Sequence, residues 1–182
     1  MTRLTRVLGR CRREPVRGAR WALDFYIVSR YISAMPATVS LKEYRALAEL
    51  RFQIRRFVAF SEASARSVNL EPQQHQLLLA IRGLPDGVEP TIGCLAERLQ
   101  IQHNSAVDLV IRCVERQLVR KQPSPMDGRQ VQVVLTVKGI RVLEKLAVAH
   151  RTELLTRAPA LIGALEALAG TMGRRRGQER QP

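Results

Sequence analysis

The chain has 182 residues, enough for one domain with a substantial core, and it is strongly basic, with 30 Lys and Arg against 16 Asp and Glu and a formal net charge of +14. A basic protein favours polyanionic partners, because binding releases the counterions condensed on them. The charge is uneven: residues 1–40 carry a net +6, residues 171–182 carry +3, and the residues between carry only +5. No glycine-rich phosphate loop, nucleophile elbow, paired-carboxylate motif or metal signature is present, which argues against an enzyme and against a bound cofactor.

The first 35 residues have two interpretations. Arginines crowd residues 3–20 and precede an apolar run at 21–28, which Asp24 interrupts and Arg30 follows. The run is too short and too charged for a membrane span, and no cleavage site follows it. The segment is either an amphipathic extension that adds to a dimer or binds DNA, or upstream sequence translated in error before a natural start at Met35. We favour the second interpretation.

Two helices are predicted next. Residues 41–67 carry one apolar stripe, made of Leu47, Leu50, Ile54, Phe57 and Val58. Residues 72–83 carry a second, made of Leu77, Leu78, Ala80 and Ile81. The second helix begins with Gln73, Gln74 and His75, for which we expect capping and solvent exposure. Lining of a pocket between these helices and the segment that follows is the alternative. Residues 84–90, with two prolines and a glycine, form a loop.

Residues 90–118 predict a helix-turn-helix. Thr91 is a plausible N-cap for a helix over 91–99, and a second helix after Ile101 buries Ala106, Leu109, Val110 and Cys113. Its opposite face carries short polar groups first and long basic groups later: His103, Asn104, Ser105, Asp108, Arg112, Glu115 and Arg116. That order suits a recognition helix whose start meets base edges in the major groove, with Arg112 and Arg116 nearer phosphates.

A basic hairpin follows. Arg120 and Lys121 precede a turn-rich stretch at 123–128, and the alternation of Val131, Val133 and Leu135 is typical of a strand with one face on a core. Residues 119–135 therefore predict a two-stranded wing with a basic tip.

The remaining apolar helices predict a dimer. Residues 137–157 and 159–169 read as helices broken near Pro159, and residues 171–182 as a basic disordered tail. Together with residues 41–67 they are too apolar for the small winged module alone. We expect them to pair with a second copy, which would place two recognition helices about 34–36 Å apart on a pseudo-palindrome. A monomeric helical core around residues 72–83 is the alternative.

At this point the chain resembles the multiple-antibiotic-resistance regulator (MarR) family of bacterial transcription factors. The resemblance is carried by residues 95–99 (LAERL), the run 105–119, residues 127–129 (DGR) and residues 135–139 (LTVKG), and it covers roughly 41–170. It implies a mainly α fold with a small β-hairpin wing, in which 72–136 form the DNA-binding lobe and 41–67 and 137–169 the dimerisation helices.

The resemblance also implies roles for individual residues. Asn104 and Ser105 would read the major groove, and Arg129, oriented by Asp127, would reach the adjacent minor groove, where narrow A·T-rich sequence attracts arginine. Two positions depart from the family. Gln117 stands where a glycine is common, and it lacks glycine's ease at positive φ if the helix ends there. Asp108 stands where a basic residue is common, and near phosphates it needs a cytosine amine or a partner such as Arg112.

Ligands of such regulators typically bind a pocket beside the lobe, so a small-molecule effector is implied, with Gln73, Gln74 and His75 as candidate lining. Cys11, Cys94 and Cys113 fit a reducing cytoplasm and form no metal spacing. Cys113 is either an oxidant sensor or a small buried hydrophobe on the apolar stripe, which is the commoner role. The three histidines are far apart in sequence, so no zinc site is expected.

The sequence thus predicts a cytoplasmic, homodimeric, ligand-responsive regulator that binds double-stranded DNA. We expect a repressor rather than an activator, because occlusion of a promoter needs no additional contact surface. The alternatives are a winged module that binds a protein partner and a non-specific DNA-binding protein. The basic wing argues against the first, and a salt dependence without sequence preference would reveal the second.

Overall fold

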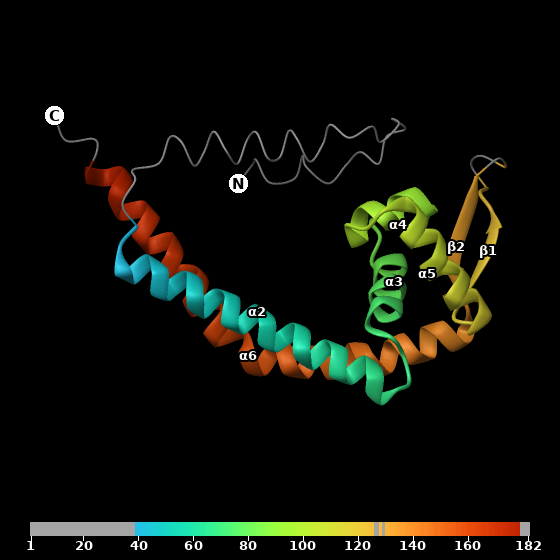
Figure 1. Ribbon diagram of the computed structural model, residues 1–182, viewed down its shortest axis with the longest axis horizontal. Helices are drawn as coiled ribbons and strands as arrows, with labels where there is room; N and C mark the ends of the chain where they lie inside the picture. The colour runs from blue at the N-terminus through green and yellow to red at the C-terminus, as the bar shows by residue number, and fades with distance from the viewer. Residues whose placement is uncertain (1–38, 126–127, 129, 179–182) are drawn as a thin grey trace.

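The computed structural model describes residues 39–125, 128 and 130–178, so the predicted N-terminal extension up to residue 35 lies outside the described residues. The elements in chain order are α2 (Leu41–Ser67), α3 (Pro72–Arg82), α4 (Ile92–Leu99), α5 (His103–Glu115), β1 (Val119–Pro123), β2 (Val131–Leu135) and α6 (Val137–Gln178). Figure 1 shows two parts. A lobe contains α3, α4, α5 and the hairpin, and α2 with the stretch of α6 beside it forms a long curved pair, here called the arm. The predicted fold class, mainly α with a small β-hairpin wing, is confirmed.

The helix ends of the lobe follow local sequence rules. Thr91 is the N-cap of α4, and its hydroxyl accepts a hydrogen bond from the backbone N–H of Cys94 at 3.3 Å, as predicted. Pro72 opens α3, where its missing N–H costs nothing. Helix α5 ends at Glu115, and Gln117 adopts φ 58° although it is not glycine. Gln117, which stands where the family often has a glycine, therefore adopts a left-handed backbone conformation after the helix.

The hairpin pairs β1 with β2 antiparallel, from Val119 opposite Leu135 to Pro123 opposite Val131. The predicted loop before α4 adds to its edge. Thr91 forms a bridge with Gln132, and the N–H of Val133 donates to the carbonyl of Pro90 at 2.9 Å. The wing is therefore fastened to the start of the helix-turn-helix.

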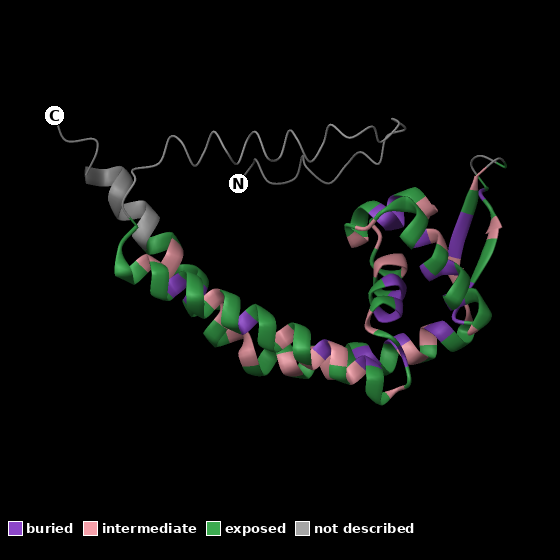
Figure 2. Ribbon diagram, in the orientation of Figure 1, coloured by how far each residue is buried: buried purple, intermediate pink, exposed green. Residues whose placement is uncertain are grey.

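The apolar core lies in the lobe. Figure 2 shows buried residues gathered on the lobe elements and mostly partial or full exposure along the arm. The fully buried side chains include Leu77, Leu78, Leu95, Leu109, Val110, Val119 and Val133. Leu143 and Leu146, near the start of α6, join the same cluster. The lobe and the first turns of α6 therefore form one packed unit.

Two predictions about the C-terminal part are wrong. The helix does not break near Pro159, because α6 continues from Val137 to Gln178 with the proline inside it. An interior proline costs about 3 kcal/mol or more, and beyond it the helix still buries Ala164, so continued packing against α2 offsets that cost. Residues 171–178 of the expected disordered tail are helical, in keeping with the high helix propensity of arginine. Residues 179–182 lie outside the described residues.

Candidate nucleic-acid interface

The start of α5 presents a polar surface. Ala106, Leu109, Val110 and Cys113 are buried on one side of the helix. The helical repeat then turns the other side outward, and His103, Asn104, Ser105 and Asp108 lie on it, all four exposed. These short donors and acceptors lie within the first two turns. The sequence-predicted base-reading residues are thus brought together on one accessible face.

The wing places further positive charge on the lobe. Arg120 and Lys121 are exposed on β1. The residues expected at the tip, Asp127 and Arg129, lie outside the described residues. The strands that lead to the tip have a defined register, so the path of the hairpin up to Pro123 and from Val131 is known.

The wing is held near the tip end of its paired strands by a residue that the sequence did not single out. Glu89 accepts hydrogen bonds from the Ser124 hydroxyl and from the Gln132 side-chain amide, both at 2.6 Å. Ser124 and Gln132 are buried. A carboxylate with two such donors fixes the loop before α4 to both strands. Glu89 stands in a loop with no motif of its own, so only the tertiary fold could reveal this role.

The basic residues at the end of α5 turn toward the lobe. Arg116 Nη1 donates to Gln74 Oε1 at 2.9 Å, and Nη2 donates to the carbonyl of Asn69. Arg112 lies 3.7 Å from the carboxylate of Glu71, with both side chains about half exposed. The sequence offered Arg112 as one of two possible partners for Asp108, but the ion pair of Arg112 in the structure is with Glu71. The basic residues predicted to lie nearer phosphates thus have intramolecular partners at the start of α3.

The three candidate effector residues have different surroundings. Gln74 is buried and its Oε1 accepts from the N–H of Glu71 at 3.2 Å, which closes a capping box. Gln73 lines two open cavities beside α5, one of about 300 Å³ with Arg98 and Ile101, and one of about 480 Å³ with Ser105 and Asp108. His75 is buried elsewhere. The three do not form one pocket.

His75 belongs to an aromatic cluster where the lobe meets the arm. Its ring lies 4.8 Å from that of His150 on α6, centroid to centroid, and Phe57 and Phe60 of α2 meet the His150 ring edge-on. Burial, with a smaller contribution from repulsion by His150, lowers the pKa of His75 to about 4. His75 is therefore neutral near pH 7. His75 and His150 are far apart in the sequence, so sequence patterns could not predict that their rings lie side by side.

The structure favours the buried-hydrophobe role of Cys113. Its side chain is fully buried in the core, and burial raises the pKa of the thiol to about 11. A thiol with a raised pKa holds little thiolate at neutral pH and reacts slowly with oxidants. Among the described residues, no group of three or more His, Cys, Asp or Glu side chains is arranged to hold a metal ion.

Two helices joined by a short turn, an exposed polar start on the second, and a hairpin fastened beside it define a winged helix-turn-helix. Residues 68–130 match the model of the MarR family, which confirms the resemblance seen in the sequence. The match spans most of the lobe and leaves most of the arm outside it. A search of curated proteins found no match.

Solved structures share the fold. The chain is similar to AbsC, a MarR family transcriptional regulator from Streptomyces coelicolor, with 19% identity, 78% of this chain and 99% of that chain covered, and a TM-score of 0.58. It is also similar to a single-residue mutant of S. aureus MepR bound to an oligodeoxyribonucleotide (16% identity, 71% and 94% covered, TM-score 0.50). A third is Bordetella bronchiseptica BpsR, whose DNA binding is regulated by 6-hydroxynicotinic acid. It has 23% identity, with 68% of this chain and 89% of that chain covered, and a TM-score of 0.50. At these identities the likeness shows a common fold.

No helix within the described ranges combines the length and the apolar character needed to cross a bilayer.

Proposed function

We propose that the protein is a homodimeric, sequence-specific DNA-binding regulator that represses transcription by occupying a pseudo-palindromic operator. One observation carries the proposal: the exposed polar start of α5 lies beside a basic wing, within a fold of the MarR type. Asn104 and Ser105 meet base edges in the major groove, and Arg120 and Lys121 meet the phosphates that flank it. Arg129 enters the minor groove from the wing tip. MepR, which shares the fold, was solved with an oligodeoxyribonucleotide.

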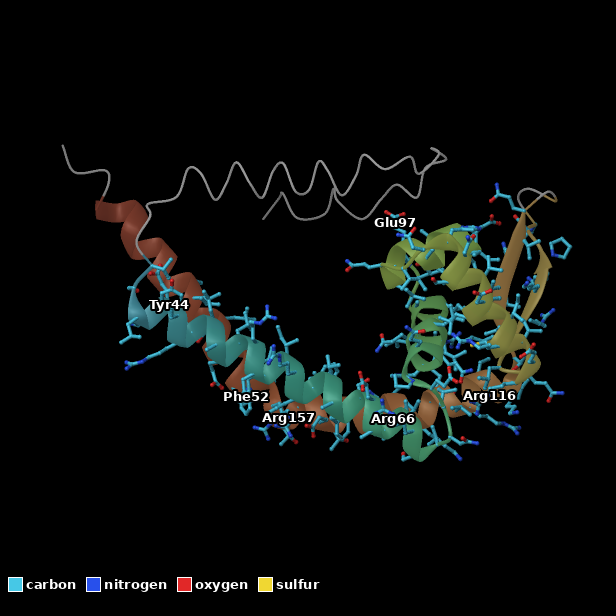
Figure 3. All side chains as sticks on the ribbon, viewed as in Figure 1. Tyr44, Phe52, Arg66, Glu97, Arg116 and Arg157 are labelled. Carbon is cyan, nitrogen blue, oxygen red and sulfur yellow. The ribbon has the colours of Figure 1, made fainter. Side chains whose placement is uncertain are left out.

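The second copy pairs along the arm. Val148, Leu155 and Ile162 follow one another at seven-residue intervals on α6, and they are 57%, 71% and 52% exposed in the single chain. Tyr44 and Phe52, labelled in Figure 3, leave further aromatic surface open on α2. Exposed large apolar side chains of this kind on both helices of the arm support an interface there. The arm extends away from α3 (Figure 1), which speaks against a monomeric core wrapped around that helix.

A small molecule regulates the binding. The open cavity of about 480 Å³ is lined by Gln73 together with Ser105, Asp108 and Arg112 of the recognition helix. A ligand there touches the residues that meet DNA and shifts the dimer toward a state that binds less well. BpsR offers a parallel, since 6-hydroxynicotinic acid regulates its DNA binding. Acting on DNA as a repressor, the protein works in the cytoplasm.

The test is a competition. Purified protein binds duplex from the region upstream of its own coding sequence in the presence of excess random duplex at physiological salt. Retention on one short pseudo-palindromic site supports the proposal. Loss of all binding to the competitor would leave a non-specific DNA-binding protein, and no binding to any duplex would leave a module for a protein partner.

Two substitutions sharpen the test. Arg129→Ala weakens operator binding by about 1–3 kcal/mol, as expected for loss of one good groove contact, whereas Arg82→Ala, which removes an exposed arginine at the end of α3, has no effect at the same salt. Asn104→Ala relaxes preference at particular base pairs. Equal weakening on every sequence would instead make Asn104 a phosphate contact.

A further inference from the structure

The segment Arg116–Leu118, directly after the recognition helix, is where both helices of the arm are attached to α5. The side chain of Arg116 reaches toward α2. It donates to the carbonyl of Asn69, two residues after α2 ends, and to Gln74 Oε1, which belongs to a residue only 1% exposed. Gln74 in turn caps the N-terminus of α3 through Glu71. One guanidinium therefore ties the end of α5 to the turn that follows α2.

The start of α6 holds the same segment by its carbonyls. The Lys138 ammonium donates to the Arg116 carbonyl at 2.9 Å, and the Thr136 hydroxyl lies 2.6 Å from the Gln117 carbonyl oxygen and 3.1 Å from that of Leu118. A Cβ on Gly139 would overlap the carbonyl oxygen of Leu118, so the two backbones approach as closely as they can. Figure 3 places Arg116 at this junction of lobe and arm.

The two ends of α5 thus differ. Its start is exposed and carries the polar face, and its end is joined to the turn after α2, to α3 and to the start of α6 through four hydrogen-bonded side chains, Arg116, Gln74, Thr136 and Lys138. Two charge-assisted bonds from a planar guanidinium fix an angle as well as a distance.

We infer that Arg116 is a positioning residue, which holds the recognition helix at a fixed angle to the arm, and that it does not contact a phosphate. The inference rests on the proposed function, and it replaces the sequence-based expectation that Arg116 lies near phosphates. In the dimer the angle sets the distance between the two recognition helices. Arg116 thereby determines which half-site spacing the protein prefers.

The experiment measures half-site spacing and salt dependence together. A site is first selected from random duplex by the wild-type protein, and variants of that site are made with one base pair inserted or deleted at its centre. Affinity of wild type and Arg116→Ala for each duplex is measured at several salt concentrations. Discrimination between the selected spacing and the shifted ones falls about fivefold or more in Arg116→Ala, the low end of a typical coupling between sites, and the slope of log K against log salt is unchanged.

The matched control is Arg120→Ala, which removes a basic side chain that is exposed on the wing. It leaves the spacing preference intact, and its salt slope falls by about one if that arginine meets a phosphate. Should Arg116→Ala fail to fold, Thr136→Val tests the same junction from α6 without changing any charge, and it likewise reduces spacing discrimination. A salt slope lowered by about one in Arg116→Ala, with wild-type spacing preference, would overturn the inference. Failure of the wild type to select any site would instead overturn the proposed function, and the inference with it.

Discussion

The lobe and the arm differ in where they place their apolar side chains. In the lobe, large aliphatic residues such as Leu77, Leu95 and Leu109 are fully buried. In the arm, the residues of α2 that are buried are small or polar, namely Ala46, Gln53, Ser61 and Ala65, and several of the large ones are exposed. Leu155 is 71% exposed. The lobe therefore has its own core, whereas the arm leaves several of its large apolar side chains exposed in the single chain.

The stripe predicted for residues 41–67 shows how the difference arises. Leu50 and Phe57 are partly buried, whereas Leu47, Ile54 and Val58 are 44%, 47% and 46% exposed. One broad apolar stripe is thus divided in two: α6 of the same chain covers one part, and the other part is exposed. Burial of apolar area contributes roughly 25 cal/mol per Å², so covering the open part in the proposed dimer would stabilise it.

The largest expected effect comes from placing a charge among the exposed apolar side chains of the arm. Leu155→Glu places a charge where the proposed dimer needs an apolar contact, and an unpaired charge in such an interface is costly. We expect a monomer in equilibrium sedimentation and operator affinity lowered by about a thousandfold or more, toward the non-specific level.

The matched control for Leu155→Glu is Leu79→Glu in the lobe. Leu79 is also an exposed leucine on a helix, 47% accessible on α3. This variant stays a dimer. If Leu155→Glu remained dimeric while Leu79→Glu dissociated, the interface would lie on the lobe. The assignment of the dimer interface to the arm would then be wrong.

A smaller effect is expected at the junction of the regions, from pH. His75 is 2% exposed and its pKa is lowered to about 4 from the usual 6.5. Between these values the unfolded chain binds a proton that the folded chain does not, so stability falls as pH drops from 6.5 toward 4, by on the order of 3 kcal/mol in all.

Urea unfolding at fixed protein concentration, from pH 7.5 to 4.5, measures this loss of stability. His75→Phe keeps a ring beside His150 and flattens the pH profile, whereas His103→Ala, which removes an exposed histidine, leaves the profile unchanged. A wild-type profile that is flat over this range would show that His75 takes up a proton without cost and that the junction is open to water.

Features that depend on neighbours in sequence could be predicted, and those that depend on the tertiary fold could not. The Thr91 cap, the hairpin at 119–135 and the exposed polar start of α5 each follow from short patterns. The inward turn of Arg116 and the pairing of His75 with His150 join segments far apart in the chain. The continuous α6 was missed because a proline rule is local, while the packing that offsets it is not.

The smallest expected effect comes from removing one helix N-cap in each region. Thr91 caps α4 in the lobe and Ser40 caps α2 at the outer end of the arm, and each side chain accepts from a backbone N–H at 3.3 Å. Thr91→Ala lowers the free energy of unfolding by about 1 kcal/mol, because α4 belongs to the packed core. Ser40→Ala removes the same kind of cap hydrogen bond, together with the Ser40 hydroxyl's bond to the Glu43 carboxylate. Its turn lies at an exposed helix end, where opening costs little, so the measured loss is close to zero. Equal losses in urea unfolding of the two variants would mean that the arm unfolds together with the lobe as one cooperative unit, and that the partner's contacts extend to the first turn of α2.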